Sequence, residues 1–540
     1  MINFRQYIYV LLLLATMLLG GCIKNDLPYP VVELQIKALS ADGLIGAPVI
    51  DEANRTITLI LEEQTDIENV HITAVEYSEN TTPSMEVVGT HDLRSPLHVT
   101  LSLYQDYEWT IQAEQTIERY FTVEGQIGKT EWNISTRSAT AYVGFDDRSN
   151  VRVTSLKLAA SDITTYEWAE GIDPNNFNSV RYVYVTCHGR TERWSLYVKK
   201  TDVVVSIAQA DGWGRVMWLY GNGLSGTELG FRYRKVGDTE WIEVDNVEVD
   251  GGSFRAKVGG LTPYTEYEIV AYSGENVSAT QIVTTEGILT LENGDFEKWE
   301  TIKKIVCPYY TEEDAFWGTG NPGAAMVSAT VTDKSEDVRP GSSGRYSARL
   351  ESTFANMAGI GKFAAGNLFV GKYVATVGTN GIVGFGRPFT ARPTALKLWL
   401  KYNCGAVDKI GTLPSGSTLQ AGDNDTGSIF IALGTWTAEE YGVDATGQVM
   451  GTDQYPVIVD TRDKGTFFNP SSAGVVAYGE LLLTQSVDEW QEFTIPLDYT
   501  TTSVVPTHIV IVCSASRLGD YFTGSTQSVM WLDDMELVYE

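Results

Sequence analysis

Short runs of Val, Ile, Thr, Tyr and Trp recur along this chain, and Gly, Asn, Asp and Pro separate them. Examples are Thr56–Leu61 (TITLIL), Tyr182–Val185 (YVYV) and Ile509–Val512 (IVIV). Polar and apolar residues that alternate with a period of two are typical of strands with one buried face, whereas a period of 3.6 indicates helices. Long stretches with the helical period are missing. The pattern predicts an all-β fold of tandem β-sandwich modules.

Length, composition and charge refine this picture. A chain of 540 residues is too long for one core, so about three to five domains are expected. A hydrophobic content of 43% is ample for folded domains. The net charge of −30 argues against nucleic acid as a partner, because phosphate backbones require basic patches. Neutral glycans and bound calcium are compatible with it.

The N-terminus has the pattern of a secretory signal with a lipidation site. Residues 1–21 carry one basic residue, Arg5, before an apolar run that ends in small residues, and Cys22 follows directly. The run is too short for a membrane-spanning helix, and small residues before a cysteine form a lipobox. We expect cleavage before Cys22, lipidation of its thiol and attachment to the membrane through the lipid.

The lipobox predicts an exported protein of the cell envelope. The expected location is the outer membrane, at the cell surface or on the periplasmic face, with residues 22–30 as a linker. The alternative is an ordinary signal peptide with a chance cysteine. Four further cysteines form no CxxC pair, which removes support for zinc; one disulfide and buried free thiols both remain open. They are Cys187, Cys307, Cys404 and Cys513.

An internal repeat follows the linker. The segments that begin at Arg55 (RTITLILEEQTDIENVHI) and Arg137 (RSATAYVGFDDRSNVRVTSL) both pass from a strand through an acidic pair into a second strand. Their ends align residues 117–120 (IERY) with 191–194 (TERW). Two copies predict two small β-sandwiches, either binding modules or a spacer stalk, and the lack of a recurring aromatic or polar cluster favours the stalk. The predicted modules span residues 31–124 and 125–200.

The next segment, residues 201–286, has a more specific pattern. An early Trp218 is followed by Leu261-Thr262-Pro263-Tyr264-Thr265-Glu266-Tyr267. This segment resembles the fibronectin type III family. The resemblance implies a tyrosine corner, in which the hydroxyl of Tyr267 bonds to backbone upstream.

The last segment, residues 287–540, forms a larger unit. It opens with Asn293–Glu297 (NGDFE) and closes with Trp531–Leu537 (WLDDMEL). Many jelly-roll carbohydrate-binding domains begin and end with motifs of this kind, and their first and last strands pair. At these motifs the chain resembles the family called putative carbohydrate metabolism domain, found in lipoproteins of gut Bacteroidetes. The resemblance implies a large jelly-roll-like β-sandwich that contacts carbohydrate, and it names no reaction.

A glycan site needs a flat aromatic face for the sugar ring and polar partners for its hydroxyls. Aromatic residues in Gly-rich and Asp-rich loops are the candidates, with Trp317 the first choice because Gly318, Gly320 and Gly323 would leave its ring open. Tryptophans in strand-like contexts are expected in the core: Trp299, Trp399, Trp490 and Trp531. The predicted carbohydrate-binding residues are Trp317, Asn321, Trp436, Tyr441 and Tyr455.

Acidic residues offer one candidate metal site. Pairing of the first and last strands would bring Glu297 close to Asp533 and Asp534, and oxygen ligands suit calcium, so a structural calcium ion is predicted there. The alternative is that these acids cap a β-turn. The segment Asp423–Gly427 (DNDTG) resembles the start of a calcium loop, but a solvated turn is the preferred interpretation.

Catalysis has no sequence signature here. G-x-S-x-G and H-E-x-x-H motifs are absent, and no histidine has a neighbour that marks a nucleophile–base pair. The primary prediction is a lipid-anchored protein whose terminal domain binds an oligosaccharide or polysaccharide without catalysis, displayed on a stalk of β modules. The alternatives are a glycoside hydrolase with its site in residues 287–540 and a structural surface or adhesin component. Other envelope proteins are further candidate partners.

Overall fold

The computed structural model describes residues 33–52, 54–171, 173–357, 360–414 and 416–540. Strands dominate all of these ranges, so the predicted all-β fold is confirmed. The predicted signal and Cys22 lie outside the described residues. Within the described part of the chain, no helix has the length and apolar character needed to cross a membrane.

The first module packs a three-stranded sheet, in the order β1-β4-β6, against a five-stranded sheet, in the order β2-β3-β8-β7-β5. Its core lies between Leu34 and Ile111 and includes the fully buried Trp109. The strands are β1 (Ile36–Ala41), β2 (Val49–Asp51), β3 (Thr56–Leu61), β4 (Val70–Tyr77), β5 (Thr82–Pro83), β6 (Gly89–His91), β7 (Leu97–Ser102) and β8 (Asp106–Gln115).

The second module has a five-stranded sheet in the order β10-β11-β15-β14-β13 and the β9–β12 pair. Its core extends from Phe121 to Val198. Because Phe121 and Val123 belong to this core, the predicted boundary at residue 124 is wrong, and the second module begins before β9. The strands are β9 (Tyr120–Val123), β10 (Glu131–Asn133), β11 (Ser138–Val143), β12 (Val153–Lys157), β13 (Thr164–Trp168), β14 (Arg181–Cys187) and β15 (Arg190–Lys200).

The two modules share the order of their five-stranded sheets. In each, an early strand runs parallel to the last one, with Thr56 opposite Thr110 and Ser138 opposite Ser195. This register makes the buried Trp109 the counterpart of the buried Trp194. The repeat is therefore present. The predicted alignment of its end is wrong, because residues 108–110 (EWT), and not residues 117–120, correspond to the end of the second copy.

The third module consists of two sheets, in the orders β16-β17-β21-β20 and β19-β18-β22-β23, with β24 paired to β22. The bond predicted for Tyr267 is present, since the backbone N–H of Thr262 donates to its hydroxyl oxygen at 3.0 Å. The strands are β16 (Ser206–Gly212), β17 (Met217–Asn222), β18 (Leu229–Lys235), β19 (Ile242–Glu243), β20 (Glu248–Asp250), β21 (Ser253–Val258), β22 (Glu266–Ser273), β23 (Asn276–Val277) and β24 (Gln281–Thr284).

The terminal domain is a sandwich of a five-stranded sheet, β28-β29-β42-β35-β39, and a nine-stranded sheet built on β37-β33-β32-β41-β36-β38-β40. Its first strands are β25 (Glu300–Ile302), β26 (Ile305–Cys307), β27 (Trp317–Thr319), β28 (Thr332–Ser335), β29 (Ser347–Glu351), β30 (Thr353–Met357), β31 (Ile360–Ala364), β32 (Asn367–Val377), β33 (Asn380–Phe385) and β34 (Arg387–Pro388). The remaining strands are β35 (Ala395–Asn403), β36 (Gly427–Gly434), β37 (Val457–Asp460), β38 (Val475–Leu483), β39 (Val487–Pro496), β40 (Asp498–Tyr499), β41 (His508–Ser514) and β42 (Val529–Val538).

Short helical turns connect these strands. They are α2 (Asn321–Ala324), α3 (Ala438–Tyr441), η1 (Glu312–Asp314), η2 (Ala325–Val327), η3 (Lys464–Thr466) and η4 (Gly519–Tyr521). The opening motif contacts the closing one, because the N–H of Met535 donates to the carbonyl of Gly294 at 2.7 Å. The opening motif itself forms turns and no strand, and the strands that pair with β42 are β29 and β35.

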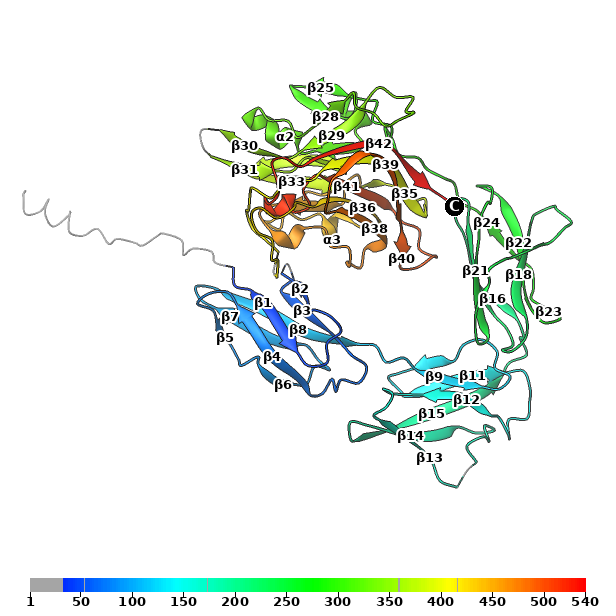
Figure 1. The fold of residues 1–540 in the computed structure, drawn as a ribbon. Coiled ribbons are helices and arrows are strands. Elements are labelled where there is room, and N and C mark those ends of the chain that lie inside the picture. The colour runs from blue at the N-terminus through cyan, green and yellow to red at the C-terminus, as the bar shows by residue number, and fades with distance from the viewer. Residues whose placement is uncertain (1–32, 53, 172, 358–359, 415) are drawn as a thin grey trace, which may run out of the picture.

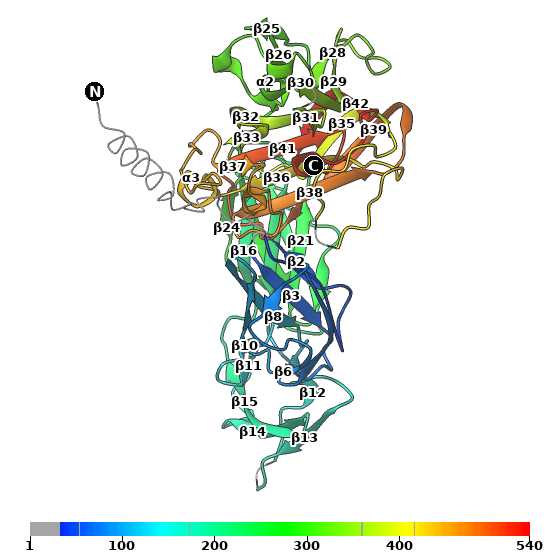
Figure 2. The same cartoon turned by 90° about the vertical axis from the view of Figure 1, so that its left-hand side faces the viewer.

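The four modules follow one another around a bend, so that the first module lies next to the terminal domain (Figure 1). The ammonium of Lys464 in the terminal domain pairs with the carboxylate of Glu52 in the first module at 2.8 Å. Turned by 90°, the molecule is elongated, with the terminal domain at one end and the second module at the other (Figure 2).

Candidate functional site

The nine-stranded sheet of the terminal domain is buried on both faces. On β36, Ile429 and Ile431 point into the core between the two sheets. Phe430 and Ala432 point to the opposite, outer face, where they join a second apolar cluster. This outer face carries aromatic residues, and no third sheet of the described structure covers it. Its side chains can therefore line a binding site.

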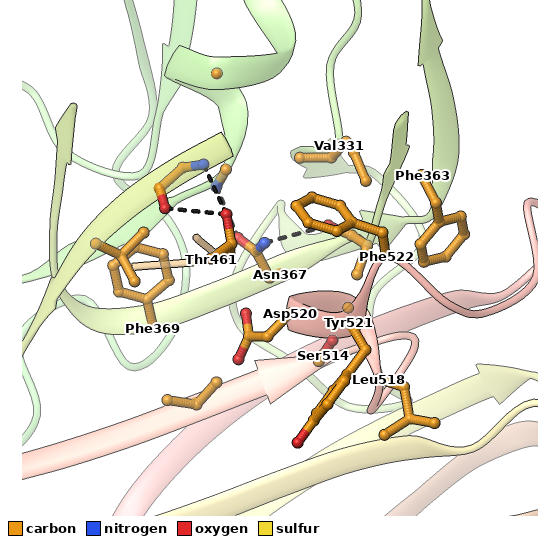
Figure 3. Close-up of a pocket in the computed structure, with 18 of the residues that line it drawn as sticks. Val331, Phe363, Asn367, Phe369, Thr461, Ser514, Leu518, Asp520, Tyr521 and Phe522 are labelled. Atoms are coloured by element: carbon orange, nitrogen blue, oxygen red, sulfur yellow. Dashed lines mark hydrogen bonds between the residues drawn. The ribbon is translucent and has the colours of Figure 1, made fainter. Parts of the chain in front are cut away.

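That outer face forms the floor of a cavity of about 730 Å³ (Figure 3). Strands β33, β32, β41, β36 and β38 supply the floor. The α2–η2 segment, the β30–β31 hairpin, residues 467–470 and the turn of residues 517–522 supply the walls. This volume lies within the range of about 300–1,000 Å³ that is usual for small-molecule sites.

Aromatic rings dominate the lining, and they come from both the floor and the walls. Phe369 is almost fully buried at the floor, whereas Phe522, which follows η4, is half-buried at the wall. Figure 3 shows Phe363 and Phe522 on one side of the cavity and Phe369 on the other. The aromatic lining residues are Phe363, Phe369, Tyr373, Phe385, Phe430, Phe467, Phe468, Tyr478, Tyr521 and Phe522.

Most polar groups of the lining are bonded within the protein. The amide oxygen of Asn367 accepts from Gly320 N–H at 2.7 Å. The hydroxyl of Thr461 accepts from Gly381 N–H at 3.0 Å. The ammonium of Lys362 donates to Asn380 at 2.8 Å and lies 3.7 Å from the centre of the Phe522 ring. These bonds hold the wall and floor in place before any ligand arrives.

Asp520 is different. Its carboxylate points into the middle of the cavity (Figure 3), and within the described ranges it has neither a hydrogen-bond partner nor an ion-pair partner. Its side chain is exposed within the cavity, with protein around the carboxyl group. Burial raises the pKa of Asp520 to about 6. A carboxylate held in this way is ready to accept hydrogen bonds from a ligand.

A second carboxylate lines the same cavity from β38. Glu480 accepts a bond from the guanidinium of Arg517 at 3.3 Å. Arg517 begins the turn that carries Asp520, three residues further along the chain. The two carboxylates therefore share a cavity, but only Glu480 is paired with a cation.

The predicted first choice for the sugar platform is wrong, because Trp317 is completely buried and presents no ring face to solvent. Its indole N–H donates to the carbonyl of Glu292 at 2.8 Å, and it packs on Phe296. Asn321, predicted to bond a sugar hydroxyl, is 2% exposed. Its amide bonds four backbone groups, which are the carbonyls of Val306 and Thr332 and the N–H groups of Val331 and Thr332.

The other three predicted sugar-binding residues also lie outside the cavity lining. Trp436 is 2% exposed and packs edge-on against Phe468, behind the wall. Tyr441 is half-buried against the same outer cluster. Tyr455 is half-buried and covers Gly384, where a Cβ would lie 2.3 Å from its ring. None of the five predicted sugar-binding residues therefore lines the cavity.

Three tryptophans predicted for the core are half-exposed instead. Trp399, Trp490 and Trp531 lie on the outer side of the five-stranded sheet, and only Trp299 belongs to the core. Cations cover these rings: Lys401 lies 4.5 Å from the Trp531 ring, and Arg339 lies 5.3 Å from the Trp399 ring.

The predicted calcium ligands are occupied by donors of the protein. Glu297 accepts the backbone N–H groups of Arg345 and Tyr346, at 2.8 and 2.7 Å. Asp533 accepts the N–H of Arg339 at 3.0 Å, and the guanidinium of Arg339 pairs with Asp534. The described residues include no group of three or more His, Cys, Asp or Glu side chains that could hold a metal ion. The predicted calcium site is therefore not assembled in this structure.

The DNDTG segment is solvated only in part, because Asp423 and Asn424 are exposed whereas Asp425 is 4% exposed. Its carboxylate accepts the hydroxyls of Ser516 and Ser528 and the N–H of Ser525, at 2.6 to 2.8 Å. The four cysteines outside the N-terminal segment are free thiols.

The sequence did contain one signal for the cavity. The strands that form its floor, such as Gly427–Gly434 (GSIFIALG) and Val475–Leu483 (VVAYGELLL), are almost continuously apolar. Such runs indicate strands buried on both faces, and therefore a covered outer face. The pairs Phe467-Phe468 and Tyr521-Phe522 lie in loops, and their side chains line this face.

Comparisons with solved structures and family models found similarities over parts of the chain. The chain's fold is similar to two crystal structures, each described as a putative glycoside hydrolase. The one from Bacteroides thetaiotaomicron VPI-5482 is 16% identical, with 95% of this chain and 98% of that chain covered and a TM-score of 0.30. The one from Bacteroides vulgatus ATCC 8482 is 19% identical, with 46% and 98% covered and a TM-score of 0.31.

Scores this low carry no argument about function, and no curated protein matches the chain in sequence. The family model described as "Putative carbohydrate metabolism domain" matches residues 295–538, a segment that contains the whole cavity. Residues 295–538 are thus similar in sequence to this family.

Proposed function

We propose that the terminal domain binds an oligosaccharide in the cavity on the outer face of its nine-stranded sheet. The observation that carries this proposal is the aromatic lining combined with the unpartnered carboxylate of Asp520. Aromatic faces pack against the apolar side of a sugar ring, and a few well-placed polar groups bond its hydroxyls. The cavity offers both kinds of surface within one enclosure.

Each part of the lining has a distinct role in this proposal. The half-buried rings of Tyr521 and Phe522 at the wall stack on the sugar. Asp520 accepts hydroxyl hydrogens, while Arg517 donates to hydroxyl oxygens from the edge of the cavity. Few contacts of this kind remain favourable after the ligand is ordered, so the Kd is expected in roughly the micromolar to millimolar range.

The test is a glycan array with the full chain, followed by titration calorimetry on the best ligand. Phe522→Ala should weaken binding roughly two- to tenfold, because one aromatic contact contributes about 0.5–1.5 kcal/mol. Tyr310→Ala is the matched control, since Tyr310 is 53% exposed in the same domain and lies outside the cavity lining. Equal affinities for the two variants, or no glycan bound by the wild type, would contradict the proposal.

The lipid anchor is a further part of the proposal. Lipidation at Cys22 would attach the chain to the outer membrane of the cell envelope. The small residues before Cys22 support it. Cys22→Ser should release the protein from membranes, and fractionation measures this. A variant that still partitions with the membrane and is processed normally would contradict the anchor.

A further inference from the structure

Four charged side chains of the described residues line the cavity, and three of them have a partner for their charge. Arg517 and Glu480 form an ion pair at 3.3 Å, so their charges cancel. The ammonium of Lys362 lies over the ring of Phe522, 3.7 Å from its centre. Asp520 alone has no counter-ion within the described ranges. Because charges enclosed by protein are normally paired, this carboxylate calls for a cation from the ligand.

The aromatic rings of the cavity suit a cation as well as the face of a sugar. Phe369, Tyr521 and Phe522 surround the space into which the unpaired carboxylate points (Figure 3). Aromatic faces attract cations, and the attraction is stronger where water is excluded. A cation of the protein already uses the Tyr521 ring, since the ammonium of Lys464 lies 5.6 Å from its centre. An ammonium group beside the unpaired carboxylate therefore meets a second attractive surface.

The electrostatic potential around Tyr521 is negative. Burial raises the pKa of Tyr521 to about 12, and the neighbouring carboxylates of Glu52 and Asp520 add to this rise. Each of these two carboxylates adds more than the guanidinium of Arg517 takes away. The net charge of the chain is −30, so the long-range field of the protein has the same sign. Both fields raise the local concentration of cations.

We propose that the sugar bound in this cavity carries a protonated amine that pairs with Asp520, so that the ligand class is an amino sugar with a free ammonium group. This inference rests on the proposed function, because it assigns a chemical class to the glycan of the same site. The ammonium supplies up to three donors to the carboxylate and its surroundings. A hydroxyl or an acetamido group leaves the carboxylate without a counter-ion, and a sugar carboxylate brings two like charges together.

Methyl glycosides test the proposal with the full chain in titration calorimetry at pH 7. The methyl glycosides of glucosamine, galactosamine and mannosamine are each compared with the N-acetyl form, the neutral sugar and the uronic acid of the same series. The amine form should bind about tenfold more tightly than the neutral form, because a hydrogen bond between two charged groups is stronger than one from a hydroxyl. The uronic acid should bind most weakly.

Asp520→Asn tests the partner of the amine. This variant keeps the shape of the side chain and removes its charge, so the amine form should lose about tenfold in affinity and then bind no more tightly than the neutral form. Asp488→Asn is the matched control, since Asp488 is exposed in the same domain and lies outside the cavity lining. It should keep the full preference for the amine. Thermal unfolding of both variants checks that the domain remains folded.

The possible results separate this inference from the proposed function. Wild-type protein that binds glycans without preferring the amine form would overturn the inference and leave the proposed function intact. A preference for the amine that survives in Asp520→Asn would show that another group holds the ammonium, and this would overturn the inference as well. If the wild type binds neither these methyl glycosides nor any glycan on the array, both proposals are wrong.

Discussion

At the scale of single residues, the same side-chain type has opposite roles in this domain. Asn321 and Asp425 are surrounded by glycines and serines in the sequence, which made both look like solvated or ligand-binding positions. In the structure both are buried, and each has a full set of protein donors or acceptors. Within the part of the chain that the structure describes, Asp520 has none, and it points into the cavity. Hydrogen-bond partners from distant segments decide these roles, and local sequence does not contain them.

Asp425 provides a test at this scale. Asp425→Ala leaves Ser516, Ser528 and the N–H of Ser525 without their acceptor. Each buried donor left unpaired costs about 1–3 kcal/mol, so the variant should be destabilised by several kcal/mol. Differential scanning calorimetry on the full chain should show the transition of the terminal domain at a lower temperature. Asp488→Ala, at an exposed position, should leave that transition unchanged, and equal melting of the two variants would contradict the buried network.

At the scale of elements, strands were easier to predict than the faces they present. The period-two pattern of Thr56–Leu61 correctly gives a strand with one buried face. The run Ile509–Val512 is apolar at every position, and only pairing with β36 and β32 shows which residues face the core and which face the cavity. The core positions predicted for Trp399, Trp490 and Trp531 are wrong for a related reason. Cations cover the outer faces of these rings. Pairing between distant strands, not local composition, locates the site.

The tyrosine corner of the third module is a prediction of the sequence that the geometry bears out at Tyr267. Tyr267→Phe keeps the ring in the core and leaves the N–H of Thr262 without an acceptor, which costs about 1–3 kcal/mol. Hydrogen exchange at the Thr262 amide, measured by mass spectrometry on the full chain, should become faster. Tyr264→Phe is the control, because Tyr264 is 79% exposed three residues away. Unchanged exchange in Tyr267→Phe would show that the bond contributes nothing to the corner.

At the scale of the whole molecule, polar contacts join each module to the next. Between the third module and the terminal domain, Arg392 is 4% exposed and pairs with Glu286 at 2.7 Å, and Trp213 packs on Tyr499. Between the first two modules the contact is more exposed: Arg190 binds Asp66 and Glu68. Sequence could not identify these pairs, because their members lie over a hundred residues apart.

The joint between the first two modules is therefore expected to depend on pH. The hydrogen bonds from Arg190 hold the pKa of Asp66 well below its usual range. A lowered pKa means that the joined state favours the carboxylate, so the joint has its full strength above about pH 4 and weakens as the pH falls further.

Small-angle X-ray scattering on the full chain measures this directly. Between pH 7 and pH 3 the wild type should gain a larger radius of gyration while circular dichroism reports intact strands. Asp66→Asn should already show the larger radius at pH 7 and change little on acidification, because it keeps the shape of the carboxyl group without its charge. High salt should shift the wild type in the same direction, since Arg190 and Asp66 are 40% and 19% exposed and their attraction is partly screened. If the wild type and Asp66→Asn have the same radius at pH 7, this pair does not hold the two modules together.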